Sequence, residues 1–468
     1  MNLRFFYFLL ISSAIVNLTG CSDDDENVIS SIVSSITLSE EVIDVEEPMT
    51  PVSFKGGKTL SFDVNMGSGA FHFKDDPDDE FYTITDRGPN IPCDDSTDSV
   101  GVENFCIGSV TDAGGRVIDE RDNTGTIFAS AEFTPTIYKF NIDTGGAIGA
   151  KVGYEVKQTI TLMDNDNNPI SGLPNPLIGM TTENGYDNQG NSLDFDPAGI
   201  NPKAIVKLSN GTFWLAEEYA PSLVHVAANG RILERVVPIG VENSLADANY
   251  RVIGLLPAIL KKRHLNRGIE SLAISLDEQF LYFIMESPLA NPDESAFSYS
   301  RYVRLFKISL QQGDLESVVG EYIYTLDEAN TFIADNTSQQ SDVKVSEMLA
   351  LDTDELIILE RVTRHTKLYR VSLDTATNIL NSEWDIEALN QLSLSLETQS
   401  NLAVQGIMPL SKQSVFDSRS EISDLDSNIE GLTLLNDEYA VFINNNEFAQ
   451  NGVKTRITVA KIVKQLNK

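Results

Sequence analysis

The sequence predicts an all-β protein, and a β-propeller-like arrangement of five to seven blades with loop insertions explains its patterns best. Short segments that alternate between apolar and polar residues follow one another along most of the chain. One pattern recurs: a strand of small and apolar residues ends on a polar or acidic residue, and a turn and a second alternating strand follow. Repetition on this scale is typical of radial β-blades.

The repeated strand has clear copies, and most of them end on an acid. The copies are FYTITDR (81–87), GTFWLAEEY (211–219), FLYFIMES (280–287), ELIILER (355–361) and EYAVFINNNE (438–447). A further acid stands just upstream in RGIESLAIS (267–275), KVSEMLALD (344–352) and SNIEGLTLL (427–435). Because the strands of a propeller are arranged around one axis, these polar ends are expected to form a ring of carboxylates at the mouth of a central channel.

An alternating strand follows most copies closely, so that each pair resembles a hairpin. These strands are TIYKFNIDTGG (136–146), LVHVAANGRILERV (223–236), RYVRLFKISLQQGD (301–314), KLYRVSLDTAT (367–377) and RITVAKIV (456–463). A sixth pair could lie within 55–75 or 152–210, and a β-sandwich with long loops is the alternative fold. Helix signals are few: a short helix is expected within Ala246–Arg263, and an insertion between blades at 381–425.

The charge balance narrows the class of ligand. The chain has 468 residues, with 34 Lys and Arg against 69 Asp and Glu, which gives a formal net charge of −35. Nucleic-acid binding requires a basic surface, so this class of function is excluded. The balance fits calcium binding, attraction of cationic ligands, or simply a well-solvated exported protein.

The N-terminal residues predict export and a lipid anchor. Arg4 precedes the apolar segment Phe5–Val16, which is too short to span a membrane, and the sequence Leu-Thr-Gly then leads to Cys21. This looks like a bacterial lipobox, with a signal peptide at 1–20 and lipidation of Cys21. Because Ser22 rather than Asp follows the cysteine, the outer membrane facing the periplasm is the expected location. Residues 21–50 are then an acidic flexible tether, and 51–468 the propeller domain.

Apart from Cys21, the chain has two cysteines, Cys93 and Cys106. An even pair in an exported chain predicts a disulfide, here closing a loop rich in Asp, Ser and Gly.

Several familiar catalytic patterns are missing from the sequence. There is no G-x-S-x-G nucleophile elbow, no P-loop and no Rossmann glycine pattern, and the four histidines fit no known signature. Asp164–Asn168 begins like an EF-hand loop, but Pro169 and Asn175 stand where its glycine and bidentate glutamate belong.

The acids of the expected ring are the main candidates for chemistry, and carboxylates from several blades would suit a divalent cation, Ca²⁺ more than Mg²⁺. They are Asp86, Glu218, Glu270, Glu347, Glu360 and Glu430. Alternatively, each acid pairs with a neighbouring backbone or arginine. Arg87, Arg267 and Arg361 could together bind an anion such as phosphate, unless they pair with the acids instead.

The chain resembles the "esterase-like activity of phytase" family over about residues 55–465. The motifs that carry the resemblance are TDRGPN (85–90), FTPTIYKF (133–140), GTFWLAEEYAPSLVHVAANGRI (211–232), RHLNRGIESLAIS (263–275), ESPLANP (286–292), SEMLALDTDELIILER (346–361), LYRVSLDTATNI (368–379) and NIEGLTLL (428–435). The resemblance implies a secreted or periplasmic propeller-like protein that hydrolyses phosphate or carboxylic esters.

The residues that match the family's motifs include the candidates above together with Glu217. Two positions depart from the family's pattern: Ala198 stands where a glutamate is usual, and Asn445-Asn446 replaces Asp-Asn. Each change removes a negative charge that could bind a metal or act as a base.

The expected function is therefore metal-assisted hydrolysis of a small-molecule phosphoester or carboxylic ester by a monomer. The expected metal ligands are Glu218, Glu270, Glu347 and Glu430, and the expected catalytic residues are Asp86 as base with Arg87, Arg267 and Arg361. The alternative is a non-catalytic envelope propeller that binds a ligand or a protein. A lactonase is a third reading, and no residue separates it from the first.

Overall fold

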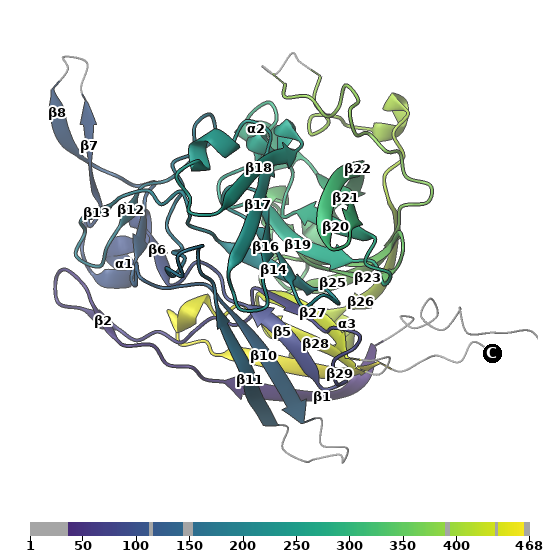
Figure 1. Cartoon of the computed structure of the whole chain (residues 1–468), viewed down its shortest axis with the longest axis horizontal. Coiled ribbons are helices and arrows are strands. Elements are labelled where there is room, and N and C mark those ends of the chain that lie inside the picture. The colour runs from purple at the N-terminus through teal and green to yellow at the C-terminus, as the bar shows by residue number, and fades with distance from the viewer. Residues whose placement is uncertain (1–35, 112–115, 144–152, 389–393, 436–438, 463–468) are drawn as a thin grey trace, which may run out of the picture.

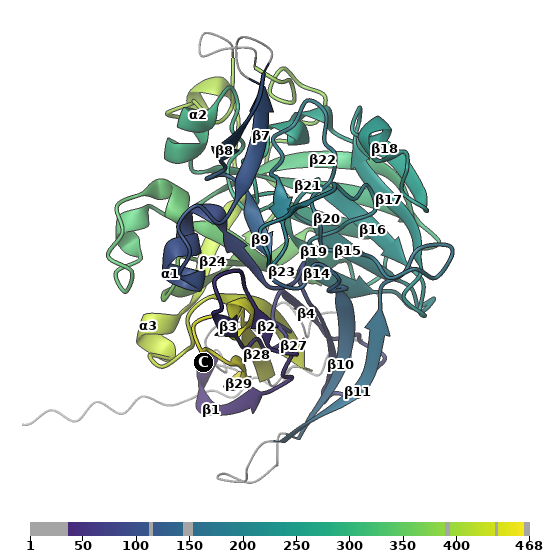
Figure 2. The same ribbon diagram turned by 90° about the vertical axis from the view of Figure 1, so that its left-hand side faces the viewer.

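The computed structural model describes residues 36–111, 116–143, 153–388, 394–435 and 439–462 (Figure 1). Within them, four sheets of four strands and one of five strands form the blades of a β-propeller (Figures 1 and 2). The innermost strands contact one another in the order β4, β14, β19, β23, β27 and back to β4, which closes a ring. The predicted β-propeller is confirmed.

Each blade is given from its innermost strand outward. The first contains β4 (Gly69–Phe71), β5 (Glu80–Ile84), β10 (Thr136–Asp143) and β11 (Gly153–Thr161). The second contains β14 (Pro202–Lys207), β15 (Phe213–Glu217), β16 (Ser222–Val226), β17 (Ile232–Pro238) and β18 (Arg251–Leu256). The third contains β19 (Ile269–Ile274), β20 (Phe280–Met285), β21 (Tyr302–Gln311) and β22 (Asp314–Thr325).

The last two blades follow the same plan. The fourth contains β23 (Lys344–Asp352), β24 (Glu355–Arg361), β25 (Thr366–Ser372) and β26 (Ser411–Asp417). The fifth contains β27 (Ile429–Leu435), β28 (Tyr439–Asn444), β29 (Thr455–Ile462) and β1 (Ile36–Val45). Neighbouring strands within the blades are antiparallel, except that β18 runs parallel to β17.

The core lies between the faces of neighbouring blades. One apolar cluster joins the second, third and fourth blades and includes Trp214, Phe283 and Met348, all nearly without exposed surface. Aromatic stacking adds to it within the third blade, where the rings of Phe283 and Phe306 lie 4.7 Å apart. Because both faces of the inner part of each sheet are covered, strands such as β15 and β20 are buried along nearly their whole length, whereas the outer strand β22 is partly exposed.

Part of the segment that was expected to be a flexible tether is a strand, β1. Residues 36–45 lie in the segment 21–50, yet they pair with β29 and complete the fifth blade, where purple β1 lies beside the yellow C-terminal strands (Figure 1). Ile43 and Val45 are buried, while Val42 is exposed. This alternation covers the edge of β29, which would otherwise present unpaired backbone groups. The signal peptide and Cys21 lie outside the described residues.

A long insertion between β5 and β10 builds a small sheet on one face of the propeller. It contributes β6 (Asn90–Pro92), the 3-10 turn η1 (Cys93–Asp95), α1 (Ser96–Val100), β7 (Ile107–Thr111), β8 (Val117–Arg121) and β9 (Thr126–Phe128). It is joined by β12 (Gly185–Tyr186) and β13 (Ser192–Leu193), and β2 (Val52–Ser53) pairs with β3 (Thr59–Leu60) beside it. A disulfide between Cys93 and Cys106, with Cα atoms 5.9 Å apart, forms the predicted pairing.

The structure tests two expectations for the connecting segments. Within Ala246–Arg263, where a short helix was expected, the chain forms β18 and then the short 3-10 helix η3 (Ala258–Lys262), which begins after Pro257 and has Lys261 and Lys262 in its last turn. The segment at 381–425 is not an insertion between blades: most of it connects β25 to β26 within the fourth blade. The 3-10 turn η6 (Leu402–Gln405) lies in it, and α3 (Ser418–Glu421) follows β26.

The remaining described helical segments are short. They are α2 (Glu294–Tyr299) and the 3-10 turns η2 (Glu242–Leu245), η4 (Ala329–Thr331), η5 (Gln340–Asp342) and η7 (Glu447–Ala449). Across the described ranges, no helix has the length and apolar character needed to cross a membrane.

Because β1 completes the fifth blade, we expect it to contribute measurably to the stability of the protein. The substitution Ile43→Ala should lower the free energy of unfolding by about 2–4 kcal/mol, because it leaves a cavity between β1 and the blade core. The matched substitution Val42→Ala, on the exposed face of the same strand, should cost less than about 1 kcal/mol. Chemical denaturation measures both, and equal effects would contradict a closing role for β1.

Candidate functional site

The start of each of four inner strands carries a β-bulge, which determines the side chains that reach the channel mouth. The register shifts between Pro202 and Ala204, Ile269 and Ser271, Val345 and Glu347, and Ile429 and Gly431. The residues inserted at these bulges are Lys203, Glu270, Ser346 and Glu430. Bulges commonly redirect side chains next to binding sites.

The second strand of each blade ends beside this bulge. Glu217, Met285, Glu360 and Asn444 pair opposite the residue that precedes the bulge. The next residue in each blade therefore stands at equivalent places around the mouth: Glu218, Glu286, Arg361 and Asn445. In the first blade, Asp86 stands two residues after Ile84, which pairs with Gly69. Because side chains alternate along a strand, the preceding residues point away from this ring.

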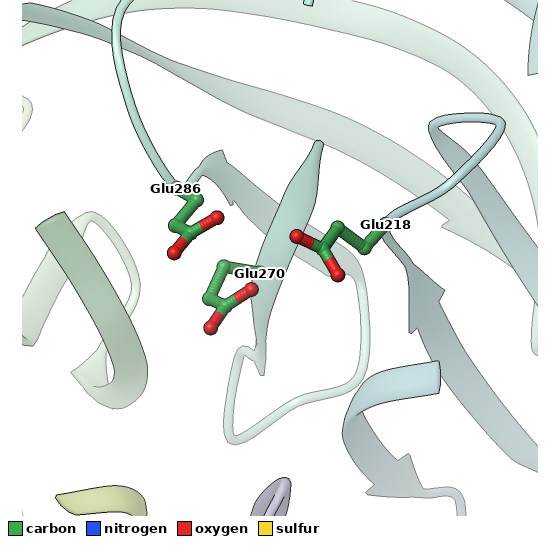
Figure 3. Close-up of side chains that lie close together, drawn as sticks. All are labelled: Glu218, Glu270 and Glu286. Carbon is green, nitrogen blue, oxygen red and sulfur yellow. The ribbon is translucent and has the colours of Figure 1, made fainter. Parts of the chain in front are cut away.

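Three mouth residues form a compact group, which we call the glutamate cluster: Glu218, Glu270 and Glu286. Each offers an oxygen that lies within 4.8 Å of those of the other two, and all three side chains are buried. Figure 3 shows their carboxylates facing a common space, from the ends of β15 and β20 and the start of β19.

The cluster is only partly neutralised by its neighbours. Glu218 accepts a hydrogen bond from Asn201 Nδ2 at 2.8 Å, and Lys203 Nζ lies 3.6 Å from the same carboxylate. Arg267 Nη1 and Lys344 Nζ lie 3.2 and 3.0 Å from Glu286 Oε1. Glu270 Oε2 and Glu286 Oε2 are buried and have no hydrogen-bond partner among the described residues.

The protonation of the cluster reflects this uneven environment. Burial raises the pKa of Glu218 to about 7 and that of Glu270 well above its ordinary value, with the charge of Glu286 adding to the second effect. Burial also acts to raise the pKa of Glu286, but the positive charges of Arg267, Lys344 and Lys203 outweigh it and lower the pKa to about 2. Without a cation, protons must therefore offset the repulsion within the cluster.

The cluster fits a hard divalent cation. All the nearby ligand atoms are carboxylate oxygens, which Ca²⁺ and Mg²⁺ prefer, and two buried oxygens lack a partner. Glu218, Glu270 and Glu286 come from two adjacent blades, so the site depends on the packing of β15 against β19.

A polar cleft of about 630 Å³ opens where residues after β5 of the first blade and after β28 of the fifth blade meet, and none of the three cluster glutamates lines it. Asp86 and Asn445 line it, and Asp95, Asp98 and Glu447 contribute further carboxylates. Asp86 accepts hydrogen bonds from Gly88 N at 3.1 Å and from Asn65 Nδ2 at 3.4 Å. Burial raises the pKa of Asp86, which is the direction that a general base working near neutral pH requires.

The expected anion-binding arginines are partly occupied by acids. Arg87 Nη1 pairs with Glu183 at 2.6 Å, a residue that the sequence did not single out. Arg361 pairs with Glu430 and donates to Ser346 Oγ at 2.8 Å. Arg267 alone of the three lies beside the glutamate cluster.

The structure separates Glu347 and Glu360 from the mouth, contrary to the expected ring. Ser271 Oγ, Ala70 N and Met348 N donate to the Glu347 carboxylate at 2.6, 3.1 and 3.0 Å. In KVSEMLALD (344–352) the acid stands one residue after the bulge, whereas in RGIESLAIS (267–275) and SNIEGLTLL (427–435) it stands at the bulge. The bulge of β23 therefore presents Ser346 instead of Glu347. Glu360 is bound by Tyr324 on β22 of the third blade, by Lys412 on β26 of the fourth blade and by Asp327 N at 3.0 Å, between the two blades.

Glu217 likewise has a structural role, because it forms a fully buried pair with Arg235 at 2.7 Å. The loop at Asp164 is closed by its own amides: Asp166 N and Asn168 N both donate to Asp164 Oδ1 at 2.8 Å. This is an Asx turn, so the EF-hand-like spacing is explained without a cation.

The residues that sequence reasoning missed are Glu286, Lys203 and Lys344. Glu286 could have been found, because it ends FLYFIMES in the same way as the acids of the other copies. Lys203 and Lys344 carried no such signal, since their places follow from the bulge of β14 and from the start of β23.

The fold and the mouth together define a β-propeller with an acid-rich polar site on its axis. A family model described as phytase-like, "Esterase-like activity of phytase", matches residues 67–448. The chain belongs to this family, and the resemblance noted in its motifs is confirmed.

Other similarities are more distant. An uncharacterized secreted protein of Arthroderma benhamiae is 23% identical over 268 residues, 51% of this chain and 52% of the relative, so the chain spans about half of that relative's length. A luciferin-regenerating enzyme shares 9% identity at a TM-score of 0.31, with 85% of this chain and 92% of the enzyme covered. Virginiamycin B lyase from Staphylococcus aureus shares 8% identity at a TM-score of 0.28, with 91% and 100% covered.

The environment of Glu347 predicts a pH dependence of stability. Burial raises its pKa to about 8, so the folded protein holds a proton that the unfolded chain loses above its ordinary pKa of 4.5. The contribution of Glu347 to stability is therefore complete at low pH and is lost as the pH rises from 4.5 to about 8. Relative to Glu347→Gln, the wild type should lose a few kcal/mol (about 1.4 per pKa unit) across this range.

Chemical denaturation at several pH values measures this difference. The control is Glu316→Gln, which replaces an exposed glutamate on β22. A pH-independent difference for Glu347→Gln would contradict the prediction.

Proposed function

We propose that this protein is a hydrolase that cleaves a small-molecule phosphoester or carboxylic ester at the channel mouth, with a divalent cation held by Glu218, Glu270 and Glu286. The observation that carries the proposal is the pair of buried oxygens, Glu270 Oε2 and Glu286 Oε2, that lack a hydrogen-bond partner within a group of three carboxylates. Membership of the esterase-like phytase family supports the reaction class.

The residues around the cluster have distinct roles in this proposal. A bound divalent cation supplies polarisation of the ester and a lower pKa of water. Arg267 and Lys344 present positive charge beside Glu286, where they would hold the anionic group of the substrate. Lys203 restrains Glu218, and Asp86 accepts a proton on the cleft side of the mouth. Arg87 and Arg361 position Glu183 and Glu430 rather than the substrate.

Ca²⁺ is the preferred cation in this proposal. It tolerates irregular carboxylate arrangements, whereas Mg²⁺ requires near-octahedral geometry and retains more water. The cluster is asymmetric, with one carboxylate bound by two cations and another without charged partners within salt-bridge distance among the described residues.

We also propose that the protein acts as a lipid-anchored monomer on the outer membrane, facing the periplasm. The support is the sequence around Cys21, which lies outside the described residues. Anchoring through the N-terminus is compatible with the fold, because the first described strand, β1, begins at Ile36 and therefore after Cys21 in the sequence.

The second candidate function is binding without turnover. It is favoured by Asn445, which stands at a mouth position where the family usually has an acid, and by the pairing of Arg87 and Arg361 with Glu183 and Glu430. In that case the cation and the polar cleft would serve a ligand or a protein partner.

Hydrolysis assays separate the two functions. The purified protein should hydrolyse at least one of p-nitrophenyl phosphate, p-nitrophenyl acetate and phytate in the presence of Ca²⁺, and EDTA should abolish the turnover. Glu270→Gln and Glu286→Gln should lower kcat at least about a hundredfold, because both oxygens of the proposed site are altered. Glu316→Gln, the exposed control, should retain full activity. Turnover that survives EDTA would overturn the metal-dependent mechanism.

Thermal unfolding tests the cation site independently of activity. Ca²⁺ at a hundred times its Kd should stabilise the wild type by about 2.7 kcal/mol and should not stabilise Glu270→Gln. Without the cation, Glu270→Gln should be at least as stable as the wild type, because it removes a buried like charge. Equal responses of the two proteins to Ca²⁺ would place the cation elsewhere.

A further inference from the structure

A separate cleft of about 450 Å³ opens on the same face of the propeller as the mouth. Its walls come from residues 179–181 before β14, 261–263 before β19 and 290–294 after β20, together with Glu387. None of the three glutamates of the cluster lines it. The cleft is therefore a neighbour of the proposed catalytic site and not a part of it.

Arg263 in the wall of this cleft is held in an unusual way. Its side chain is almost fully buried, and Nε and Nη2 donate to the backbone oxygens of Tyr219 and Thr181 at 2.7 and 2.9 Å. Nη1 is buried and has no hydrogen-bond partner among the described residues, and within those residues no carboxylate forms an ion pair with Arg263.

The other buried arginines behave differently, since each pairs with an acid. The pairs are Arg87 with Glu183, Arg235 with Glu217, Arg304 with Glu321 and Glu397, and Arg361 with Glu430. Burial of a cation without a compensating anion is costly, which is why buried charges are normally paired. Burial therefore removes water from the Arg263 guanidinium, as it does for the other buried arginines, but Arg263 has no carboxylate within ion-pair distance among the described residues.

The contacts of Arg263 leave its guanidinium fork available. The edge formed by Nε and Nη2 is engaged with two carbonyl oxygens, which fix the plane of the group. The end formed by Nη1 and the second hydrogen of Nη2 remains. This is the geometry that binds the two oxygens of a carboxylate or phosphate side by side.

The cleft is lined by three basic and three acidic residues, and each acid has a partner other than Arg263. Glu387 pairs with Lys262 at 3.0 Å, and Glu294 pairs with His264 at 2.5 Å. Asp293 caps α2 by accepting from Ser295 N at 3.1 Å. Lys261, which also lines the cleft, forms no ion pair within the described residues and adds a second cation.

We infer that this cleft is an oxyanion-binding subsite, in which Arg263 and Lys261 bind a phosphate or carboxylate group. In a chain with a net charge of −35, such a site requires local cations of this kind. Tyr219, whose carbonyl holds Arg263, directly follows Glu218 of the glutamate cluster. The inference that the cleft binds an oxyanion does not depend on the proposed function. Only the further assignment, that this oxyanion is a second anionic group of the substrate, rests on it.

Calorimetric titration with inorganic phosphate, in the presence of EDTA, tests the subsite without the proposed metal. The wild type should bind one phosphate per chain. Lys261→Gln should weaken binding about three- to tenfold, and Arg263→Lys at least about tenfold, because it keeps the charge and loses the fork. Lys55→Gln, which removes an exposed charge elsewhere, should bind as the wild type does. Arg267→Gln, at the glutamate cluster, tests the alternative that phosphate binds there.

Two results would overturn the inference. One is the absence of phosphate binding by the wild type, and the other is binding that Arg267→Gln abolishes while Lys261→Gln leaves it intact. Thermal unfolding of each variant shows whether it is folded. If Arg263→Lys is unstable, Lys261→Gln still decides the result, because Lys261 is partly exposed.

Kinetics then distinguish the two sources of the oxyanion. If it belongs to the substrate, Lys261→Gln should raise KM for an ester with two anionic groups and leave KM for p-nitrophenyl acetate unchanged. If it is free phosphate, Lys261→Gln should leave both KM values unchanged and weaken only inhibition by phosphate. A protein that binds phosphate in the cleft but hydrolyses no ester would refute the proposed function and leave the subsite in place.

Discussion

The blades approach one another closely at the channel mouth, and the polar site depends on that approach. A Cβ atom on Gly268 would lie 1.9 Å from the carbonyl oxygen of Glu218, and one on Gly67 would lie 2.2 Å from that of Asn444. Glycine is therefore required where the start of one blade meets the end of another. This contact brings Glu218 of the second blade beside Glu270 and Glu286 of the third, so the cluster is a property of the seam between two blades.

The same approach creates an electrostatic problem, which the protein solves differently around the ring. On one side, Arg361 neutralises Glu430, and Arg87 neutralises Glu183. At the glutamate cluster, Lys203, Arg267 and Lys344 are close, yet two buried oxygens stay without a partner. Buried polar atoms are seldom left in this state, because the lost hydration is not recovered. This difference, between acids that are fully paired and a cluster with two unpartnered oxygens, is what we expect of a binding site rather than of a purely structural ring of ion pairs.

Arg263 shows the opposite imbalance a short distance away. Its guanidinium is buried without a carboxylate, while the cluster has two buried carboxylate oxygens without a hydrogen-bond partner among the described residues. The two are connected through Glu218 and Tyr219, so that a cation at one place and an oxyanion at the other would complement the same face of the propeller. A ligand that carries negative charge and is bound through a divalent cation would satisfy both.

The sequence by itself determined the fold class, the family and the disulfide, because period-two alternation, repeated strand ends and paired cysteines are local patterns. It also indicated that acids gather at the mouth, and Glu218, Glu270 and Glu430 do stand there.

Which of these acids face one another depends on the three-dimensional packing of the blades. A single bulge in β23 turns Glu347 away and presents Ser346, and the pairing of β20 brings in Glu286. Side chains alternate along a strand, so a shift of one residue moves the Glu347 carboxylate away from the mouth, where groups on the innermost strands of the first and third blades bind it. Strand β1 could not be predicted from the sequence either, because its short apolar alternation is stabilised only by pairing with the edge of β29, which is far away in the sequence.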